Sequence, residues 1–323
     1  MVFVLIGVSM LMFFLVRVLP GDPIALSLGP RADEETIKKM RHEMGLDRPI
    51  HIQYLNYLNG VIRGKFGISL VENRDVLEII MEKFPATLEL ILVSMLLATG
   101  VGIPLGVTSA LRRNKLVDNL NRFLALIGVS FPQFWLGLMV QLFFGFFLGF
   151  LPITGRISVS PPTSITGLYL IDSLLTFNME AFWSSFLHIL SPAIVLSLGP
   201  LANISRLIRA NMIDQMSKDY TNMSKAVGMS HFIVSYKYML RNAFTSTLTM
   251  IGFLTPLMLG TAFVVEKVFV WPGIARFGAD AIIANDFNGV VGVTLLSGMA
   301  FVVVNFIVEQ LYGVLDPRIR LKR

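Results

Sequence analysis

The sequence predicts an all-α membrane protein with six transmembrane helices. Hydrophobic residues make up 54% of its 323 residues and charged residues only 15%, whereas soluble domains average about 25% charged residues. A helix needs about 20 mostly apolar residues to cross a bilayer. Six segments meet this requirement, near residues 2–19, 88–111, 123–151, 186–205, 243–265 and 290–314.

The composition also excludes several kinds of site. The chain contains no cysteine, so it has neither disulfides nor thiolate metal ligands. Its four histidines are scattered and show no metal-ligand spacing: His42, His51, His188 and His231. We therefore predict no metal site and no catalytic residue.

The net charge of +6 follows the pattern expected for membrane topology and does not indicate nucleic-acid binding. Basic residues are concentrated in 112–122, in 206–241 and in the tail, whereas 150–185 contains only Arg156. Cytoplasmic loops carry an excess of lysine and arginine. Because the basic segments alternate with the others, six spans allow all of them and both termini to be cytoplasmic.

Residues 1–19 are predicted to form the first span, and residues 20–87 a small helical segment outside the membrane. The first helix of that segment is expected between Asp33 and Met44. The second has an apolar face made of Ile52, Leu55, Leu58 and Ile62. A third helix, near 75–84, leads through Pro85 into the second span.

Residues 88–323 are predicted to form the other five helices. These helices contain residues that commonly break or bend a helix: Pro104, Pro132, Pro192, Pro200 and Pro256. Each proline removes a backbone hydrogen bond and frees the carbonyl four residues earlier. We therefore expect kinked spans, which suit a path that opens and closes but also occur in static bundles.

The segment 206–242 is polar and basic, unlike the apolar segments on either side. Residues 212–227 predict a helix with one apolar stripe, formed by Met216, Tyr220, Met223 and Val227. Gly228 permits a turn, and Ser230 can cap a second helix. The apolar stripe of that second helix contains Phe232, Ile233, Tyr236 and Leu240. The spacing fits a helix lying on anionic lipid and equally a helix docked on a cytoplasmic partner.

Motifs in this segment resemble a known family. "DYTNMSKAVG" and the following "YMLRNA" resemble the cytoplasmic coupling loop of binding-protein-dependent ABC transporter permeases. The resemblance is nearest to the branch for oligopeptides, dipeptides, glutathione, nickel complexes and, in some members, oligosaccharides. Further motifs agree with it in the expected order: "LPGDPI", "MGLDRPIHIQYLNYLNG", "GKFGISL", "SFPQFWLG", "LPITGRI", "VVEKVFVWPGIARF" and "LDPRIR".

The resemblance implies a type I ABC importer permease in the cytoplasmic (inner) membrane of a prokaryote. Its partners would be a second homologous permease subunit, two ABC ATPase subunits and an extracellular solute-binding protein. The chain itself would be no enzyme and would hold no cofactor, because ATP and Mg²⁺ would bind to the ATPase subunits. The sequence contains no Walker A pattern of the form G-x-x-x-x-G-K-[ST].

The resemblance also implies which residues belong to the loop that couples the permease to the ATPase. They are Lys218, Asp219, Tyr220, Ser224, Lys225, Ala226, Gly228, Met229, Arg241 and Asn242. The Glu-Ala-Ala of the wider superfamily is replaced here by Asn222, Met223 and Ser224. A second motif, "EKVFVWPG", supplies Glu266, Trp271, Pro272 and Gly273. For this motif two roles are open, a structural anchor and a contact with the docked binding protein.

The leading interpretation is the transmembrane subunit of an ATP-driven importer for oligopeptides, dipeptides or related small solutes, forming half of the translocation path. The alternatives are a permease of the same family for oligosaccharides or nickel complexes, and an ion-coupled secondary carrier. Carriers usually show inverted repeats and ionisable residues at the membrane midplane, and the sequence offers neither of them clearly.

Overall fold

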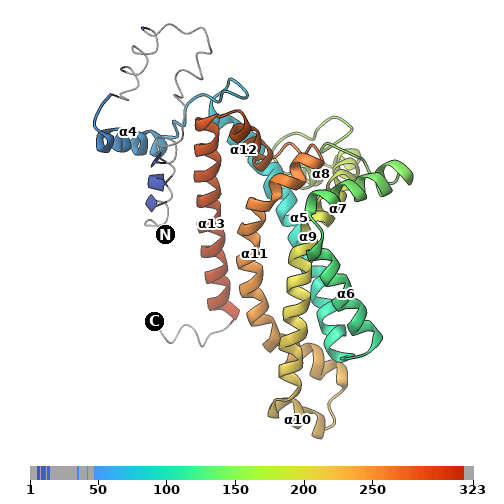
Figure 1. Cartoon of the computed structure of the whole chain (residues 1–323). Helices are drawn as coiled ribbons and strands as arrows, with labels where there is room; N and C mark the ends of the chain where they lie inside the picture. Colours follow the sequence, from blue (N-terminus) through green and yellow to red (C-terminus); the bar gives the residue numbers. More distant parts are fainter. Residues whose placement is uncertain are drawn as a thin grey trace. The chain divides into compact units, whose positions relative to one another are not determined.

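The computed structural model describes residues 47–315, together with 6, 7, 9–11, 13, 14, 35 and 42 (Figure 1). The described part of the chain is helical and contains no β-strand. Its helices are α4 (Ile50–Ile62), α5 (Val76–Leu111), α6 (Leu116–Ser130), α7 (Gln133–Val140), α8 (Tyr169–Leu175), α9 (Met179–Met216), α10 (Asp219–Ala226), α11 (Leu240–Val268), α12 (Ile274–Ile283) and α13 (Phe287–Leu315). Two π-helical segments, η1 (Gln141–Phe147) and η2 (Ile233–Met239), continue α7 and lead into α11.

Within the described residues, four helices are long and apolar enough to cross a membrane: Val76–Leu111, Met179–Met216, Ile233–Val268 and Phe287–Ile307. They contain the spans predicted near 88–111, 186–205 and 243–265 and most of the span near 290–314. The first predicted span and the helix expected from Asp33 to Met44 lie largely outside the described residues. The total of six spans therefore stays a prediction.

The span predicted near 123–151 is not one straight helix, because the chain bends by 105° between α6 and the α7–η1 pair, at the proline where a kink was expected. Helix α6 ends at Ser130, and Phe131 takes the extended conformation that a residue before proline prefers. Pro132 then starts α7. By contrast, Pro192, Pro200 and Pro256 lie inside continuous helices.

The chain divides into two compact units. Unit 1 contains Met1–Pro85 and Gly273–Val302, and unit 2 contains Ala86–Pro272 and Val303–Arg323. Helix α5 continues from one unit into the other, as the sequence predicted for the passage through Pro85. The boundary expected between 87 and 88 thus falls inside a continuous helix.

The described residues of unit 1 form two small apolar clusters. Tyr57 and Val61 of α4 pack against Val291 and Leu295 of α13. The second cluster joins Val76, Ile80, Phe84, Ile274, Val293 and Leu296. Of the apolar face predicted for α4, Leu55 and Ile62 are exposed, whereas Ile52 and Leu58 are half-buried. Tertiary contacts selected the neighbouring face, which carries the tyrosines.

Unit 2 is organised around α9, which packs against α6, α7, α8 and α11. Figure 1 shows α9 and α11 side by side along most of their length. Helix α5 also approaches α9 closely at Gly102 and Gly106. A Cβ atom on Gly106 would lie 2.7 Å from the Ser205 carbonyl oxygen and 2.7 Å from Ile208 Cγ2. Small residues at such positions allow helix backbones to approach.

Replacing Gly106 by alanine is expected to lower the free energy of unfolding by about 1–3 kcal/mol, because the backbone of α9 has to move. The matched control is Gly100→Ala on the same helix, since no atom lies within 4 Å of that Cβ position. This control is expected to be neutral or stabilising, as alanine favours helix. The measurement is unfolding of the purified protein in mixed micelles. Equal stability of the two variants would disprove the close packing.

Candidate functional site

The coupling loop (residues 206–242) lies at one end of the helices of unit 2 (Figure 1). Helix α9 ends at Met216, and α10 begins separately at Asp219. The single helix predicted for 212–227 is therefore wrong. Ser217 ends α9 by donating its hydroxyl to the Asp214 carbonyl oxygen at 2.9 Å, and Lys218 is extended. Lys218 also pairs with Asp214 at 3.2 Å.

Two side chains hold α10 against the end of α9. The Thr221 hydroxyl is fully buried and donates to the Gln215 carbonyl oxygen at 2.8 Å. The Tyr220 hydroxyl donates to Gln215 Oε1 at 2.7 Å. Thr221 and Gln215 were not among the predicted site residues, although Thr221 lies inside the "DYTNMSKAVG" motif. Its partner is six residues away across a helix break, so helical periodicity gave no signal for this contact.

The apolar stripes predicted for this loop point mostly away from the protein. Met223 and Val227 on α10 are exposed. On the following segment Phe232 and Tyr236 are exposed and stack with their ring centroids 4.6 Å apart. The buried residues of η2 are instead Val234, Ser235 and Met239. The loop thus presents apolar side chains beside charged ones.

The predicted contact residues of α10 lie on this outward surface. The exposed ones are Lys218, Asp219, Lys225, Ala226, Gly228 and Met229. Tyr220 and Ser224 are half-buried, and Ser224 donates its hydroxyl to the Tyr220 carbonyl oxygen at 2.7 Å. Arg241 and Asn242 are also exposed but lie on the first turn of α11. The structure therefore groups eight of the ten residues in and directly beside α10.

Gly228 makes the turn that ends α10. Its φ of +79° lies in the left-handed region, and no atom lies within 4 Å of its Cβ position. The Met229 N–H donates to the Ser224 carbonyl oxygen at 3.1 Å, which closes the turn. Ser230 then accepts a hydrogen bond from the Ile233 N–H at 3.4 Å. The predicted glycine turn and the predicted cap at Ser230 are both confirmed.

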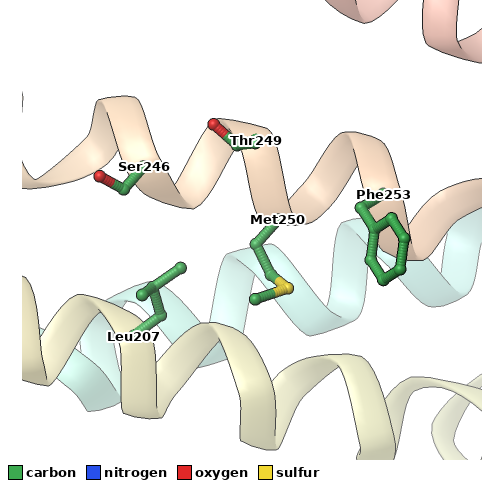
Figure 2. Close-up of a pocket in the computed structure, with 5 residues that line it drawn as sticks. All are labelled: Leu207, Ser246, Thr249, Met250 and Phe253. Atoms are coloured by element: carbon green, nitrogen blue, oxygen red, sulfur yellow. The ribbon is translucent and has the colours of Figure 1, made fainter.

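An open groove lies between α9 and α11 (Figure 2). It has a volume of about 400 Å³ and is lined by Leu207, Ser246, Thr249, Met250 and Phe253. Its lining is mostly apolar, with two hydroxyl groups one turn apart on α11 and no charged side chain. The groove can therefore accept an uncharged part of a solute, and the sequence gave no indication of it.

A buried polar cluster lies elsewhere in unit 2. Arg156 Nη2 donates to Glu89 Oε2 at 2.6 Å and to the Gly167 carbonyl oxygen at 2.8 Å. The guanidinium carbon of Arg156 lies 3.6 Å from the ring centroid of Tyr169. Glu89 also accepts the Leu170 N–H at 2.7 Å. This cluster fixes the segment before α8 against α5.

The same segment is held by a second buried carboxylate, Asp172. It accepts hydrogen bonds from the Ile165, Thr166 and Gly167 N–H groups at 3.2, 2.8 and 2.9 Å, and from the Thr166 hydroxyl at 2.7 Å. Burial alone raises the pKa of Asp172, but these hydrogen bonds outweigh it and lower the pKa below the usual range. Asp172 is therefore a structural anion that orders the loop before α8.

The motif "EKVFVWPG" is placed mostly inside the protein. Glu266 is fully buried and accepts the Thr87 hydroxyl at 2.5 Å. Trp271 is 1% exposed, and its Nε1–H donates to the Ala86 carbonyl oxygen at 2.9 Å. Gly273 is buried and precedes α12, while Pro272 is exposed. These contacts support the structural-anchor interpretation for Glu266 and Trp271, and contact with a binding protein stays a prediction.

Across the described residues, no group of three or more His, Cys, Asp or Glu side chains is arranged to hold a metal ion. The buried carboxylates described above are those of Glu89, Asp172 and Glu266, and each of them is held by hydrogen bonds or an ion pair within the fold. The described residues thus form two candidate sites. One is the exposed surface of α10 and its turn, which is partly polar and partly apolar, and the other is the uncharged groove between α9 and α11.

Comparison with known proteins identifies relatives over nearly the whole chain. The chain is 39% identical over 321 residues to the "Probable D,D-dipeptide transport system permease protein DdpB" of Escherichia coli, covering 99% of this chain and 94% of that protein. It is 38% identical to the di/tripeptide transport system permease protein DppB of Pseudomonas aeruginosa, covering 98% and 95%. It is 36% identical to the dipeptide transport system permease protein DppB of Alkalihalophilus pseudofirmus, covering 98% and 96%.

A solved structure of the MetNI methionine ABC transporter in inward-facing conformations has the same fold, with a TM-score of 0.52 at 15% identity. The similarity covers 72% of this chain and 93% of that one. Residues 102–321 match the family described as "Binding-protein-dependent transport system inner membrane component", and residues 1–91 match the N-terminal region of such components. The coupling loop with its glycine turn is thus part of a permease, and the chain belongs to the inner membrane components of binding-protein-dependent ABC transport systems.

Proposed function

We propose that this chain is the transmembrane subunit of an importer for dipeptides and oligopeptides, driven by cytoplasmic ATPases. The relatives named above, which carry dipeptide or tripeptide transport in their names, support the choice of cargo. The observation that carries the proposal is α10, an eight-residue helix that ends at a glycine turn and exposes apolar side chains beside lysines.

Helix α10 docks on an ATPase subunit rather than resting on lipid. Interfacial helices gain their membrane affinity from a large buried apolar area. The exposed large apolar side chains of α10 and its turn are only Met223, Val227 and Met229. Three such side chains suit a narrow cleft on a protein surface. Lys218 and Lys225 would then contact the rim of that cleft.

This role sets the orientation in the membrane. The basic residues in 112–122 and 206–241 lie on the cytoplasmic side together with α10. Both termini are cytoplasmic as well, with six spans in total. The segments that connect the spans on the other side of the membrane face the solute-binding protein.

The groove between α9 and α11 forms part of one half of the translocation path, and a second, homologous permease subunit supplies the other half. Its hydroxyl groups, Ser246 and Thr249, can exchange hydrogen bonds with the amide groups of a passing peptide (Figure 2). The groove can also accept the side chains of the peptide whatever their charge, because the rest of its lining is apolar: Leu207, Met250 and Phe253.

The test is uptake of a labelled dipeptide by liposomes that contain the purified chain. Uptake and ATP hydrolysis are expected only when the second permease, both ATPases and the binding protein are present. Uptake by the chain alone would contradict the proposal. So would uptake that stops when the proton gradient is dissipated at constant ATP, because that result identifies an ion-coupled carrier.

A further inference from the structure

A buried carboxylate in unit 2, that of Asp118, holds together the turn between α5 and α6. Asp118 lies in the first turn of α6 and is fully buried. It accepts hydrogen bonds from the Ser109 hydroxyl at 2.5 Å and from the Asn114 N–H at 2.8 Å. Ser109 belongs to α5, and Asn114 lies in the turn. One side chain therefore fixes the end of α5 to the start of α6.

The same carboxylate forms an ion pair with α9. Arg209 Nε donates to Asp118 Oδ1 at 2.6 Å, and Arg209 Nη2 donates to Asp118 Oδ2 at 2.7 Å. Two parallel, charge-assisted hydrogen bonds are strong and also fix the relative orientation of the groups that they join. Arg122 approaches Asp118 as well, but its Nε lies 3.8 Å from Oδ1 and its side chain is 51% exposed. The contact from Arg209 is therefore the one that orients α6 on α9.

Neutral contacts further along the helices support this junction. Asn121 Nδ2 donates to the Ser205 hydroxyl at 2.9 Å and to the Leu105 carbonyl oxygen at 3.3 Å. These bonds join α5, α6 and α9 close to the narrow approach at Gly106 described above. Among these contacts on α9, the one at Arg209 lies nearest to α10 along the chain.

Helix α9 connects the junction directly to α10. Gln215, which accepts the hydrogen bonds of Tyr220 and Thr221, lies six residues after Arg209. The helix is continuous between Arg209 and Gln215, so these residues lie about 9 Å apart along its axis. A displacement of α10 therefore moves the Arg209 guanidinium with it.

One face of α6 packs against α9, and the other face points outward. Leu116, Leu120 and Leu124 lie on successive turns of the outward face and are 72%, 50% and 59% exposed. The helix thus follows α9 only through the contacts on its packed face. Apolar contacts are non-directional, whereas the two parallel bonds from Arg209 resist sliding of α6 along α9.

Resting on the proposed function, we propose that Arg209 is a positioning residue of the transport cycle. Through Asp118 it makes α6 follow the movement that the ATPases impose on α10. Helix α6 leads into the α7–η1 pair, and together they are apolar enough to form a membrane span that is bent in the middle. The ion pair thereby links the docked helix to a second part of the membrane domain, besides α9 and α11, which adjoin the loop along the chain.

The test is the ratio of dipeptide uptake to ATP hydrolysis by the complete transporter in liposomes. Arg209→Gln is expected to lower this ratio about five-fold or more, while the binding protein still stimulates ATP hydrolysis. The reason is that α10 still docks but α6 no longer follows it. A purely structural role would lower uptake and hydrolysis together and would leave their ratio unchanged.

The matched control is Arg206→Gln, one turn earlier on α9. Arg206 is exposed, and its described hydrogen bonds go to Asn203 and to the Ala202 carbonyl oxygen of the same helix. It is not among the residues implied to couple the permease to the ATPase. The ratio of uptake to hydrolysis is expected to be unchanged in this variant.

Two further variants separate the ion pair from other effects. Arg209→Lys keeps the positive charge but cannot form the two parallel bonds, so its ratio is expected to lie between those of Arg209→Gln and the unmodified transporter. The double variant Asp118→Asn with Arg209→Gln is expected to lower the ratio no further than Arg209→Gln alone, because both substitutions remove the same contact.

Several results would overturn the proposal. An unchanged ratio in Arg209→Gln would mean that α6 moves without the ion pair, although the transport function stands. An equal loss in Arg206→Gln, or additive losses in the double variant, would mean that the pair is not the link. If Arg209→Gln does not assemble, a normal ratio in Arg209→Lys is the contradicting result. A complete, unmodified transporter without ATP-driven uptake would instead remove the proposed function itself.

Discussion

Uptake by the assembled transporter is expected to fall about ten-fold or more when Gly228 is replaced by valine, while the protein still inserts and the ATPases still hydrolyse ATP. Gly228 has a φ of +79°. A residue with a Cβ atom loses about 1–2 kcal/mol in this left-handed region, and β-branching makes the loss larger. The turn that orients α10 is then poorly populated, so ATP hydrolysis is no longer transmitted to the spans.

The control for this prediction is Gly228→Asn, because asparagine adopts the left-handed conformation more readily than other side chains. No atom lies within 4 Å of the Cβ position, so neither variant creates a clash and only the backbone preference differs. The measurement is the ratio of dipeptide uptake to ATP hydrolysis in liposomes. Normal coupling in the valine variant would show that the turn does not depend on glycine.

Arg156→Ala is expected to lower the free energy of unfolding by about 3–5 kcal/mol, since it leaves one partner of a buried ion pair uncompensated. The carboxylate of Glu89 stays buried and keeps only its hydrogen bond to the Leu170 N–H among the contacts described above. The Gly167 carbonyl loses its Arg156 donor, and the Tyr169 ring loses the cation above it. All these losses occur in one place and reinforce one another.

A surface ion pair in the same chain provides the comparison. Arg74 lies 2.9 Å from Glu82, but its side chain is 45% exposed. Arg74→Ala is expected to leave the free energy of unfolding nearly unchanged, because water screens the pair and solvates the remaining carboxylate. Both variants are compared by unfolding in mixed micelles. A small effect at Arg156, similar to that at Arg74, would contradict the burial of the Glu89–Arg156 pair.

The residues of the coupling loop illustrate how far sequence reasoning reached. The polarity of 206–242 identified the segment, and its motif gave both the family and the glycine turn. The contact that holds the helix, from the Thr221 hydroxyl to the Gln215 carbonyl oxygen, was not predicted. It depends on the break at Ser217, which arises from hydrogen bonds that compete with the helix and which helical periodicity does not encode.

The prolines also show that the sequence alone does not predict where a helix breaks. Five prolines in the predicted spans were treated alike, but only Pro132 breaks its helix into two parts. Pro192, Pro200 and Pro256 stay inside helices of unit 2 that pack against each other. Neighbouring helices compensate for the lost hydrogen bonds of a proline, so the outcome depends on packing and not on the residue itself.

By itself, the sequence determined that the chain is a helical membrane protein, where four of its long helices lie, and that Gly228 makes a turn. The free energy of burying a helix in a bilayer is a sum over consecutive apolar residues, and a left-handed turn depends on a single residue. Both features can therefore be predicted from a short stretch of sequence. Only the tertiary structure decided which face of α4 packs, where α6 and α7 bend, and that Arg156 meets Glu89 and Asp286 meets Ser69. These pairs lie 67 and 217 residues apart, and contacts at such separations follow from how the whole chain packs.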